Sequence, residues 1–357
     1  MRAAAAGKSA RVLFRVDAGP DLGMGHLSRS VALAETLRRE FGAEVVFATS
    51  RPRSTRPAII ERGFECIALK RTSAPSETEL ESLRAGLASV MPTVTVIDTP
   101  FPISERYLRS LRRVVGGRIV VMDNLCETGR HADRVIFPNA HIDAENLPVA
   151  LRANAVFGAQ YFFAREPPKA KYKPGRGRAR SVLISMGGSD PHRITLKLLE
   201  FLTRLAGDDP GLFRGLSIDL VIGPMFSFKR SVLSRARRLG TTVRVLQNVQ
   251  DLMSRMPAHD FCVLSFGVAM YEATMTHTPA LIVGHTADQG KWGRKLERLD
   301  LVLNLGHYET LVYADFAVDF SRMVRDPGLR RKLSRKAALL AGNEPGDLKT
   351  ARLLLSP

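Results

Sequence analysis

The sequence predicts an α/β protein of two domains, each built on a parallel β-sheet. The chain has 357 residues, which is too long for one ordinary core and suits two α/β domains of common size. Short runs rich in Val, Ile and Phe recur with helical stretches between them, as is typical of strand and helix alternation. A stretch rich in Pro, Gly and basic residues, without apolar periodicity, separates two sets of such runs.

The apolar runs predict ten strands, five in each half. Those of the first half cover residues 12–16, 44–48, 94–98, 118–123 and 134–138, and those of the second half cover residues 181–186, 217–222, 242–246, 261–265 and 280–283. A first helix is expected over residues 27–41, where Leu27, Val31 and Leu37 recur near the helical period. Residues 314–340 also have a helical pattern, interrupted at residues 326–328.

These elements predict the domain boundaries. We expect residues 1–165 to form the first domain, residues 166–180 the linker and residues 181–357 the second domain. Each domain starts with a strand that leads into a Gly-rich turn and a helix, so both are Rossmann-like. Ligands of open α/β sheets bind at the carboxyl ends of the strands. We therefore expect the two parallel sheets to face a cleft that holds the ligand.

The composition indicates a globular protein. Apolar residues make up 45% of the chain and charged residues 25%, and no run of about 18 apolar residues could span a membrane. The basic start of the chain lacks the apolar segment and cleavage site of a signal peptide. Cys66, Cys126 and Cys262 are scattered and suggest neither a disulfide framework nor a zinc site. We expect a cytoplasmic location.

The formal charge of +18 would attract phosphates, nucleic acids or anionic membranes. The basic residues are spread along the chain, with denser spots at residues 169–180 and 322–336. Neither spot interleaves aromatic residues or matches a known DNA- or RNA-binding motif, which disfavours nucleic acid as a partner. Peripheral contact with an anionic membrane stays open, and the sequence does not indicate the oligomeric state.

The first predicted strand ends in a Gly-rich turn that leads into the first helix. Gly23 and Gly25 would let the backbone pass close to a ligand, and the helix N-terminus offers N–H groups to an anion. His26 would lie at the mouth of the cleft, where a neutral imidazole can take a proton from water or a hydroxyl. Arg29 either reaches an anion or faces solvent. A tight turn with a helix-capping histidine is an equally good interpretation of these residues.

A second Gly-rich turn follows the first strand of the second half. Gly187, Gly188 and Ser189 again join a strand to a helix, and they could give N–H groups to a diphosphate. A plain left-handed turn is the alternative. The remaining histidines are not spaced as metal ligands, so the sequence predicts no metal site and no cofactor.

Several segments agree, in order and spacing, with one known family. They are residues 14–18 with 23–29, 123–124 with 131–133, 158–165, 184–191, and 271–272 with 288–289. Together they extend over about residues 12–289, which is most of the chain. In these segments the chain resembles the PseG/SpsG family, which includes a hydrolase of a UDP-linked diacetamido sugar.

The resemblance implies a GT-B-like, metal-independent enzyme that binds a nucleotide sugar between its domains. Such an enzyme cleaves the bond at the anomeric carbon and releases the nucleotide. His26 matches the family's catalytic histidine, and a base within reach of water is worth about 10² to 10⁴ in rate. Asp17 resembles the acidic residue near that histidine and would orient it. An Asx cap of the Gly-rich turn explains Asp17 equally well.

The resemblance also assigns nucleotide contacts to the second domain. The loop that contains Gly187 belongs to the nucleotide-binding domain, and Leu246 and Asn248 fall where related folds hold the base with backbone groups. In similar enzymes a glutamate at the position of Glu272 holds the ribose, because a carboxylate can accept two hydrogen bonds from a vicinal diol. An exposed helix glutamate is the alternative.

The chain departs from the family pattern at two places. Asp288 and Gln289 match an Asn-Gln pair that meets the sugar or phosphate, but Asp288 adds a negative charge. A Gly-Gly-Ser/Thr turn of the family is replaced by residues 265–270, SFGVAM, in which Ser265 and Gly267 stay candidates for the diphosphate. These departures indicate a changed donor or a changed reaction.

Three functions stay open at this stage. The preferred one is a nucleotide-sugar hydrolase that releases UDP or a related nucleotide from an amino or deoxy sugar, with His26 as base, in surface glycan or nonulosonate biosynthesis. The second is a GT-B glycosyltransferase, in which an acceptor hydroxyl replaces water. The third is a noncatalytic nucleotide-sugar-binding protein, which the changed turn favours and the presence of His26 disfavours.

Overall fold

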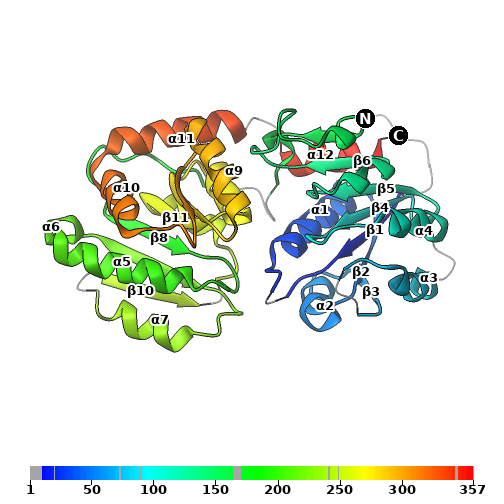
Figure 1. Ribbon diagram of the computed structural model, residues 1–357, viewed down its shortest axis with the longest axis horizontal. Coiled ribbons are helices and arrows are strands. Elements are labelled where there is room, and N and C mark those ends of the chain that lie inside the picture. The colour runs from blue at the N-terminus through cyan, green and yellow to red at the C-terminus, as the bar shows by residue number, and fades with distance from the viewer. Residues whose placement is uncertain are drawn as a thin grey trace. The chain divides into compact units, whose positions relative to one another are not determined.

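The structure, a computed structural model, describes residues 10–19, 21–71, 74–87, 91–163, 170–239, 242–247, 249–341 and 345–356. The chain divides into two compact units, both visible in Figure 1. The first consists of Met1–Glu166 and Glu344–Pro357, and the second consists of Pro167–Asn343. Each unit is built on one parallel sheet, so the predicted α/β fold class is confirmed.

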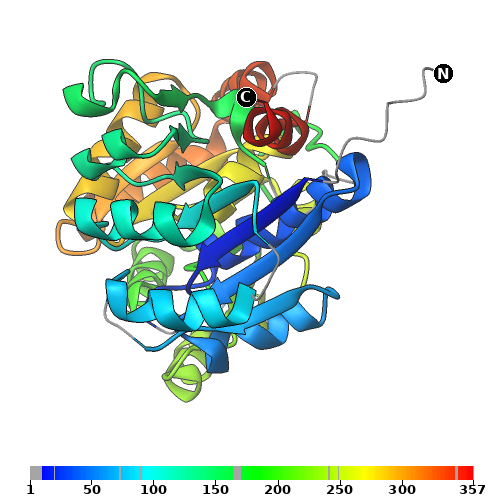
Figure 2. The ribbon, with the colours of Figure 1, turned by 90° about the vertical axis from the view of Figure 1, so that its right-hand side faces the viewer.

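Within the described residues, the sheet of the first unit has seven strands in the order β3-β2-β1-β4-β5-β6-β7. They are β1 (Arg11–Val16), β2 (Glu44–Thr49), β3 (Glu65–Ala68), β4 (Val94–Asp98), β5 (Arg118–Met122), β6 (Arg134–Phe137) and β7 (Ala155–Phe157). Neighbouring strands run parallel, as Figure 2 shows for β1 and β2. The central strands β1, β4 and β5 are almost wholly buried, because helices cover both faces.

The two faces of this sheet carry different helices. One face packs against α1 (Gly25–Phe41), α2 (Pro52–Ile60) and α12 (Gly346–Leu355). The other packs against α3 (Leu80–Leu87) and α4 (Glu105–Val115). The connections contain the short 3-10 helices η1 (Glu77–Glu79), η2 (Glu127–His131), η3 (Val149–Leu151) and η4 (Ala159–Tyr161).

The described part of the second unit has a six-stranded sheet in the order β10-β9-β8-β11-β12-β13. Its strands are β8 (Ser181–Ser185), β9 (Ser217–Ile222), β10 (Thr242–Gln247), β11 (Phe261–Ser265), β12 (Ala280–Gly284) and β13 (Leu303–His307). One face packs against α5 (Ile194–Asp208), α7 (Lys229–Ala236) and α10 (Tyr313–Arg325). Contacts with β11, β12 and β13 come from α8 (Val268–Met275) and α9 (Ala287–Arg298). The remaining helices are α6 (Pro210–Phe213), η5 (Met253–Ala258) and α11 (Pro327–Ala341).

All ten predicted strands are present, each within one residue of its expected ends. The first helix and the interrupted C-terminal helix are also confirmed, as α1 and as α10 with α11. Three strands escaped prediction, namely β3, β7 and β13. They lie at sheet edges, and β3 and β7 contain no buried residue, so they lack the apolar runs that mark the central strands.

Local sequence explains where the helices near the first sheet begin and end. Ser104 caps α4 by accepting a hydrogen bond from the Tyr107 N–H at 3.1 Å. Gly116, at φ 70°, ends α4, and Gly42, at φ 62°, ends α1. With its end fixed in this way, α1 lies on the sheet with its first turn at the carboxyl edge of β1.

The two units end at different residues from those expected for the domains. The last helix, α12, packs on α1 of the first unit (Figure 1). Thr36 Oγ1 of α1 donates to Asp347 of α12 at 2.7 Å. The described part of the expected linker, residues 170–180, lies on the second unit. There Tyr172 is buried and its N–H donates to the carbonyl of Thr276 at 2.8 Å.

Candidate functional site

Ionisable side chains of the first unit gather at the carboxyl edge of its sheet. β4 ends at Asp98, β5 is followed directly by Asp123, and His26 is the second residue of α1. β1 pairs with β4 and β4 pairs with β5, while α1 packs on β1. Because the carboxyl ends of parallel strands share one edge, these side chains meet there.

His26 and Asp98 form a hydrogen-bonded pair. Nδ1 of His26 lies 2.7 Å from Oδ1 of Asp98. The side chain of Asp98 is fully buried, whereas that of His26 is 20% exposed. One end of the pair is therefore fixed inside the unit, and the other end can be reached from solvent.

Arg29 joins this pair to a second carboxylate. Its Nε donates to Oδ2 of Asp98 at 2.8 Å, and its Nη1 donates to Oδ2 of Asp123 at 2.5 Å. Its Nη2 donates to Oδ1 of Asp98, the atom that also faces His26. The Ser30 hydroxyl donates to Asp98 at 2.9 Å, and the Asn139 side-chain amide donates to Asp123 at 2.9 Å. Both carboxylates are thus held from two sides.

The contacts of Nδ1 assign the tautomer of His26. Arg29 Nη2 lies 2.9 Å from Nδ1, but a guanidinium can only donate, and Asp98 can only accept when ionised. An unprotonated Nδ1 would place its lone pair against a carboxylate oxygen at 2.7 Å, which is repulsive. Nδ1 therefore carries the proton and donates it to Asp98. In the neutral imidazole with this tautomer, Nε2 has the lone pair that a general base needs.

Both carboxylates of this cluster are ionised. Burial alone would raise the pKa of Asp98, but the charge of Arg29, the proximity of His26 and their hydrogen bonds outweigh it, so this pKa lies well below its usual range. Burial is likewise outweighed at Asp123 by the charges of Arg29 and His141, which lowers the pKa of that carboxyl. Neither group can serve as the proton donor near neutral pH.

The Gly-rich turn before α1 leaves the first turn of this helix open to a ligand. Gly19 and Gly23 are joined by backbone hydrogen bonds, and Gly23 has φ 73°, which favours glycine. α1 starts at Gly25, its N-cap residue Met24 makes no side-chain cap, and no acidic residue lies in its first turn. The partial positive charge of the helix N-terminus therefore lies directly beside His26.

Asp17 does not orient His26, and this prediction is wrong. Asp17 accepts a hydrogen bond from Arg15 and another from the Thr49 hydroxyl at 2.8 Å, and it is buried. Along β1 the odd-numbered side chains point toward α3 and α4, whereas α1 covers the other face of the sheet. The carboxylate that contacts His26 is Asp98, from the neighbouring strand.

Sequence reasoning gave no role to three residues of this cluster. Asp98 and Asp123 stand at the carboxyl ends of two predicted strands, which is the signal that could have found them. Asn139 follows β6 and is fixed because its own Oδ1 accepts the Ile142 N–H at 3.1 Å. Arg29 was assigned to an anion or to solvent, but its guanidinium is occupied by Asp98 and Asp123.

The second unit brings together two of the predicted diphosphate segments. Gly187 follows β8 with φ 83°, and a Cβ added to it would lie 3.6 Å from the Ser265 hydroxyl, which ends β11. Behind this loop a Cβ on Gly223 would lie only 2.3 Å from the carbonyl oxygen of Gly188. The Gly187–Gly188 turn is therefore packed closely between neighbouring strands, next to Ser265. Ser189 lies in the same turn.

The helix after this turn is already capped by the protein. Both carboxylate oxygens of Asp190 accept backbone N–H groups of α5, from Ile194 at 2.9 Å and from Thr195 at 2.8 Å. Asp190 is buried and its φ is 46°. The first turn of α5 therefore has fewer N–H groups to offer a diphosphate than the Gly-rich pattern suggests.

The first turn of α8, by contrast, has no side-chain cap. Its N-cap is Gly267, and the space around Gly267 is open. Glu272 lies on the same helix and is partly buried. Burial raises the pKa of Glu272 to about 7, and the nearby charge of Asp251 contributes.

The other predicted nucleotide contacts are more dispersed. Leu246 lies on the edge strand β10, which is separated from β8 by β9. Asn248 lies outside the described residues. In the first turn of α9, exposed Asp288 pairs with Lys291 at 3.1 Å, and Gln289 Oε1 accepts the His285 N–H at 2.7 Å. Gln289 therefore closes the loop between β12 and α9.

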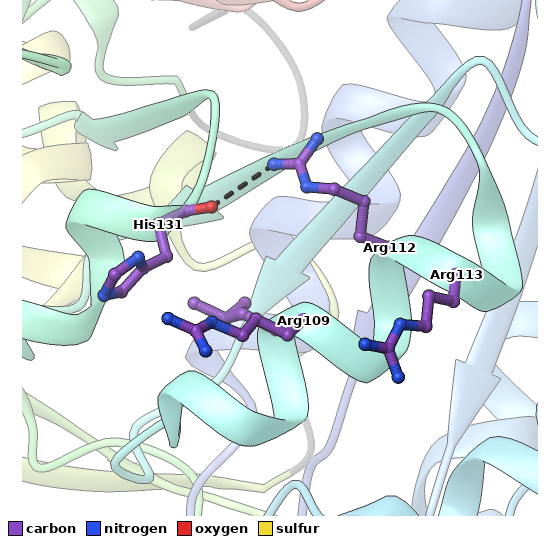
Figure 3. A pocket seen from close by; sticks show the side chains of 5 residues that line it. Arg109, Arg112, Arg113 and His131 are labelled. Atoms are coloured by element: carbon purple, nitrogen blue, oxygen red, sulfur yellow. Dashed lines mark hydrogen bonds between the residues drawn. The ribbon is translucent and has the colours of Figure 1, made fainter.

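A surface hollow of about 390 Å³ in the first unit carries basic side chains. The hollow is lined by Leu108, Arg109, Arg112, Arg113 and His131 (Figure 3). Arg109 pairs with Glu105, and Arg112 pairs with Asp133 at 3.0 Å and donates to the His131 carbonyl. The hollow contains none of the predicted site residues, and its charges are largely balanced by these pairs.

Within the described residues, no group of three or more His, Cys, Asp or Glu side chains is placed to bind a metal ion. Among the same residues, no helix has the length and apolar character needed to cross a bilayer.

No protein-family model matches the sequence. An uncharacterized protein of Methanocaldococcus jannaschii is 24% identical over 284 residues, which cover 76% of this chain and 55% of that protein. The spore coat polysaccharide biosynthesis protein SpsG of Bacillus subtilis is 22% identical over 156 residues, 44% of each chain. The chain thus spans about half the length of the curated relatives it matches, and its similarity to SpsG is weak and partial.

Solved structures are similar over nearly the whole chain. MurG of Acinetobacter baumannii matches with a TM-score of 0.66 at 12% identity, covering 97% of this chain and 99% of that one. The calicheamicin glycosyltransferase CalG4 matches with 0.63 at 14% identity, covering 98% of both. The spinosyn rhamnosyltransferase SpnG in complex with thymidine diphosphate matches with 0.61 at 15% identity, covering 97% and 100%. The chain has a GT-B-like fold.

Proposed function

We propose that the chain is a nucleotide-sugar-dependent glycosyltransferase in which His26 is the general base. The single observation that carries this proposal is the His26–Asp98 pair at the carboxyl edge of the first sheet. Its Nδ1 is held by a buried carboxylate, a helix N-terminus lies beside it, and in the neutral tautomer assigned above its Nε2 carries the lone pair. The likeness to the calicheamicin glycosyltransferase CalG4 and the spinosyn rhamnosyltransferase SpnG supports the choice of this reaction class.

In the proposed reaction, Nε2 of His26 takes the proton of an acceptor hydroxyl. The hydroxyl oxygen forms a bond to the anomeric carbon of the sugar while the bond from that carbon to the diphosphate breaks. The nucleoside diphosphate leaves with the electron pair of the broken bond. Asp98 stabilises the imidazolium that forms, because its carboxylate already accepts the Nδ1 proton.

We assign the nucleotide to the second unit. N–H groups of the uncapped first turn of α8 and of the Gly187–Ser189 turn would bind the diphosphate, and Glu272 would bind the ribose. SpnG and the glycosyltransferase VinC, two structures with similar folds, were solved with thymidine diphosphates. The nucleotide of this chain is therefore proposed to be a UDP- or TDP-type diphosphate.

A nucleotide-sugar hydrolase is the second candidate. The residue segments shared with the PseG/SpsG family favour it, together with the partial similarity to SpsG. In that reaction a water molecule replaces the acceptor hydroxyl, and every other role stays the same.

The test is the release of nucleotide from a panel of UDP- and TDP-sugars in the presence of EDTA, with and without a panel of alcohol acceptors. Release that requires an acceptor and yields a glycoside supports the transferase. Release that is independent of acceptors indicates the hydrolase. Binding of nucleotide without any release from the whole panel contradicts both and indicates a binding protein.

A further inference from the structure

The cluster around His26 contains two carboxylates for one guanidinium. Arg29 is the buried cation of the cluster, and Asp98 alone balances its charge through two hydrogen bonds. Asp123 adds a second negative charge to the same guanidinium. Asp98, Asp123 and Arg29 by themselves therefore carry a net charge of −1, which the charge of His141 beside Asp123 offsets in part.

The excess charge is at the accessible carboxylate. The side chain of Asp98 is fully buried, whereas that of Asp123 is 30% exposed. Arg29 contacts both carboxylates and lies 2.9 Å from Nδ1 of His26, so Asp123 lies within one guanidinium of the base. Asp123 is thus the solvent-accessible carboxylate of the cluster beside His26.

Asp123 is held in a defined orientation. Its φ is 53°, a left-handed conformation that non-glycine residues adopt at a cost and that aspartate tolerates better than most. Its N–H donates to the carbonyl of Ile136 at 2.8 Å, and its two oxygens accept from Arg29 and Asn139. An ionised carboxylate has about four acceptor positions, which is more than these two hydrogen bonds use.

We propose that Asp123 is a ligand-binding residue that selects hydroxyl or ammonium groups on the molecule that reacts at His26. This inference rests on the proposed function, because it identifies the chemistry of the reactant bound in the first unit. A fixed carboxylate accepts hydrogen bonds from such donors and attracts an ammonium group. It repels phosphate and carboxylate groups, so the reactant portion beside His26 is neutral or cationic.

The test uses a charge series of sugars as probes, because it measures binding without requiring turnover. Glucose, glucosamine and glucose 6-phosphate are titrated into the full chain at neutral pH, with UDP present, and Kd is measured by NMR. We expect the order glucosamine, glucose, glucose 6-phosphate from tightest to weakest. In Asp123→Asn, glucosamine should lose at least tenfold in affinity relative to glucose, and the discrimination against glucose 6-phosphate should shrink.

Two further variants separate recognition from folding. Asp123→Gly suits the left-handed backbone and removes the carboxylate, so it should show the same loss of discrimination if Asp123→Asn proves unstable. Asp133→Asn is the matched control, since Asp133 pairs with Arg112 in the same unit but away from His26. It should leave the charge series unchanged.

Three results would overturn the inference. They are equal affinities of the wild type for all three sugars, no binding of any of them, and an unchanged series in both Asp123 variants. A failure of the proposed function gives a different result. No nucleotide is then released from any donor of the panel, while the order of affinities in the charge series still depends on Asp123.

Discussion

Replacement of Asp98 by asparagine should abolish most of the catalysis while leaving the nucleotide site intact. An asparagine can donate its amide to Nδ1 of His26, which moves the imidazole proton to Nε2 and removes the lone pair that faces the reactant. A positioned base is worth about 10² to 10⁴ in rate. We therefore expect kcat to fall by about that factor, with the Kd for UDP changed less than threefold.

The same substitution should also destabilise the first unit, and the assay has to allow for this. Asp98 accepts hydrogen bonds from His26, Arg29 and Ser30, and its loss leaves the Arg29 guanidinium with Asp123 alone. Breaking a buried ion pair on one side costs about 3 to 5 kcal/mol. Turnover should accordingly be measured at 20 to 25 °C on protein whose folding is verified by circular dichroism.

A matched control exists in the second unit. Asp219 is also buried, accepts hydrogen bonds from Arg244 at 2.7 Å and 2.9 Å, and lies 3.1 Å from Nε2 of His259. Asp219→Asn also removes a buried carboxylate that pairs with an arginine and a histidine, although Arg244 is 65% exposed, and it should leave kcat within threefold. If folded Asp98→Asn keeps the wild-type kcat, or if Asp219→Asn loses as much, then Asp98 does not set the tautomer of the base.

Two further predictions concern stability, and a third concerns UDP binding. Arg15→Met should cost about 3 to 5 kcal/mol in urea unfolding, because it strands the buried carboxylates of Asp17 and Glu79; a loss below 1 kcal/mol would contradict this. Glu272→Gln should stabilise the chain by at most about 3 kcal/mol at pH 8 and by much less at pH 5. Because the pKa of Glu272 is raised to about 7 in the folded chain, the folded glutamate still holds a proton that the unfolded one has lost, and wild-type stability falls between pH 4.5 and 7. Equal melting temperatures of variant and wild type at pH 8 would refute the pKa shift. Gly223→Ala should weaken UDP binding, since its Cβ would meet the Gly188 carbonyl at 2.3 Å, and an unchanged Kd by calorimetry would show that this turn does not bind the nucleotide.

The central architecture could be predicted from the sequence because buried parallel strands are continuous apolar runs. The runs that end at Asp98 and at Ser265 have the bounds of β4 and β11. The edge strands β3 and β7 contain no buried residue, and β13 contains Asn304 and Gly306, so these three strands lack a continuous apolar run. The position of α12 was also inaccessible, because it depends on distant contacts such as that between Thr350 and the Tyr161 carbonyl.

His26 could be chosen from the sequence, but its partner could not. Asp17 and Asp98 both stand at the carboxyl ends of strands next to the first helix. Which one meets His26 depends on the face that α1 covers, and the alternation along β1 and β4 places only Asp98 on that face. The sequence pattern alone does not determine which face of the sheet α1 covers. Similarly, the sequence does not show that Arg29 pairs with Asp98 and Asp123, because these residues come together only through the strand order of the sheet.

The most direct test of a base in the first unit and a nucleotide site in the second is a comparison of wild type with His26→Ala. Both proteins are assayed for UDP affinity and for the single-turnover rate of nucleotide release from the best donor found. We predict an unchanged Kd for UDP and a loss of at least a hundredfold in the rate. A rate within threefold of the wild type would contradict the assignment of His26 as the base.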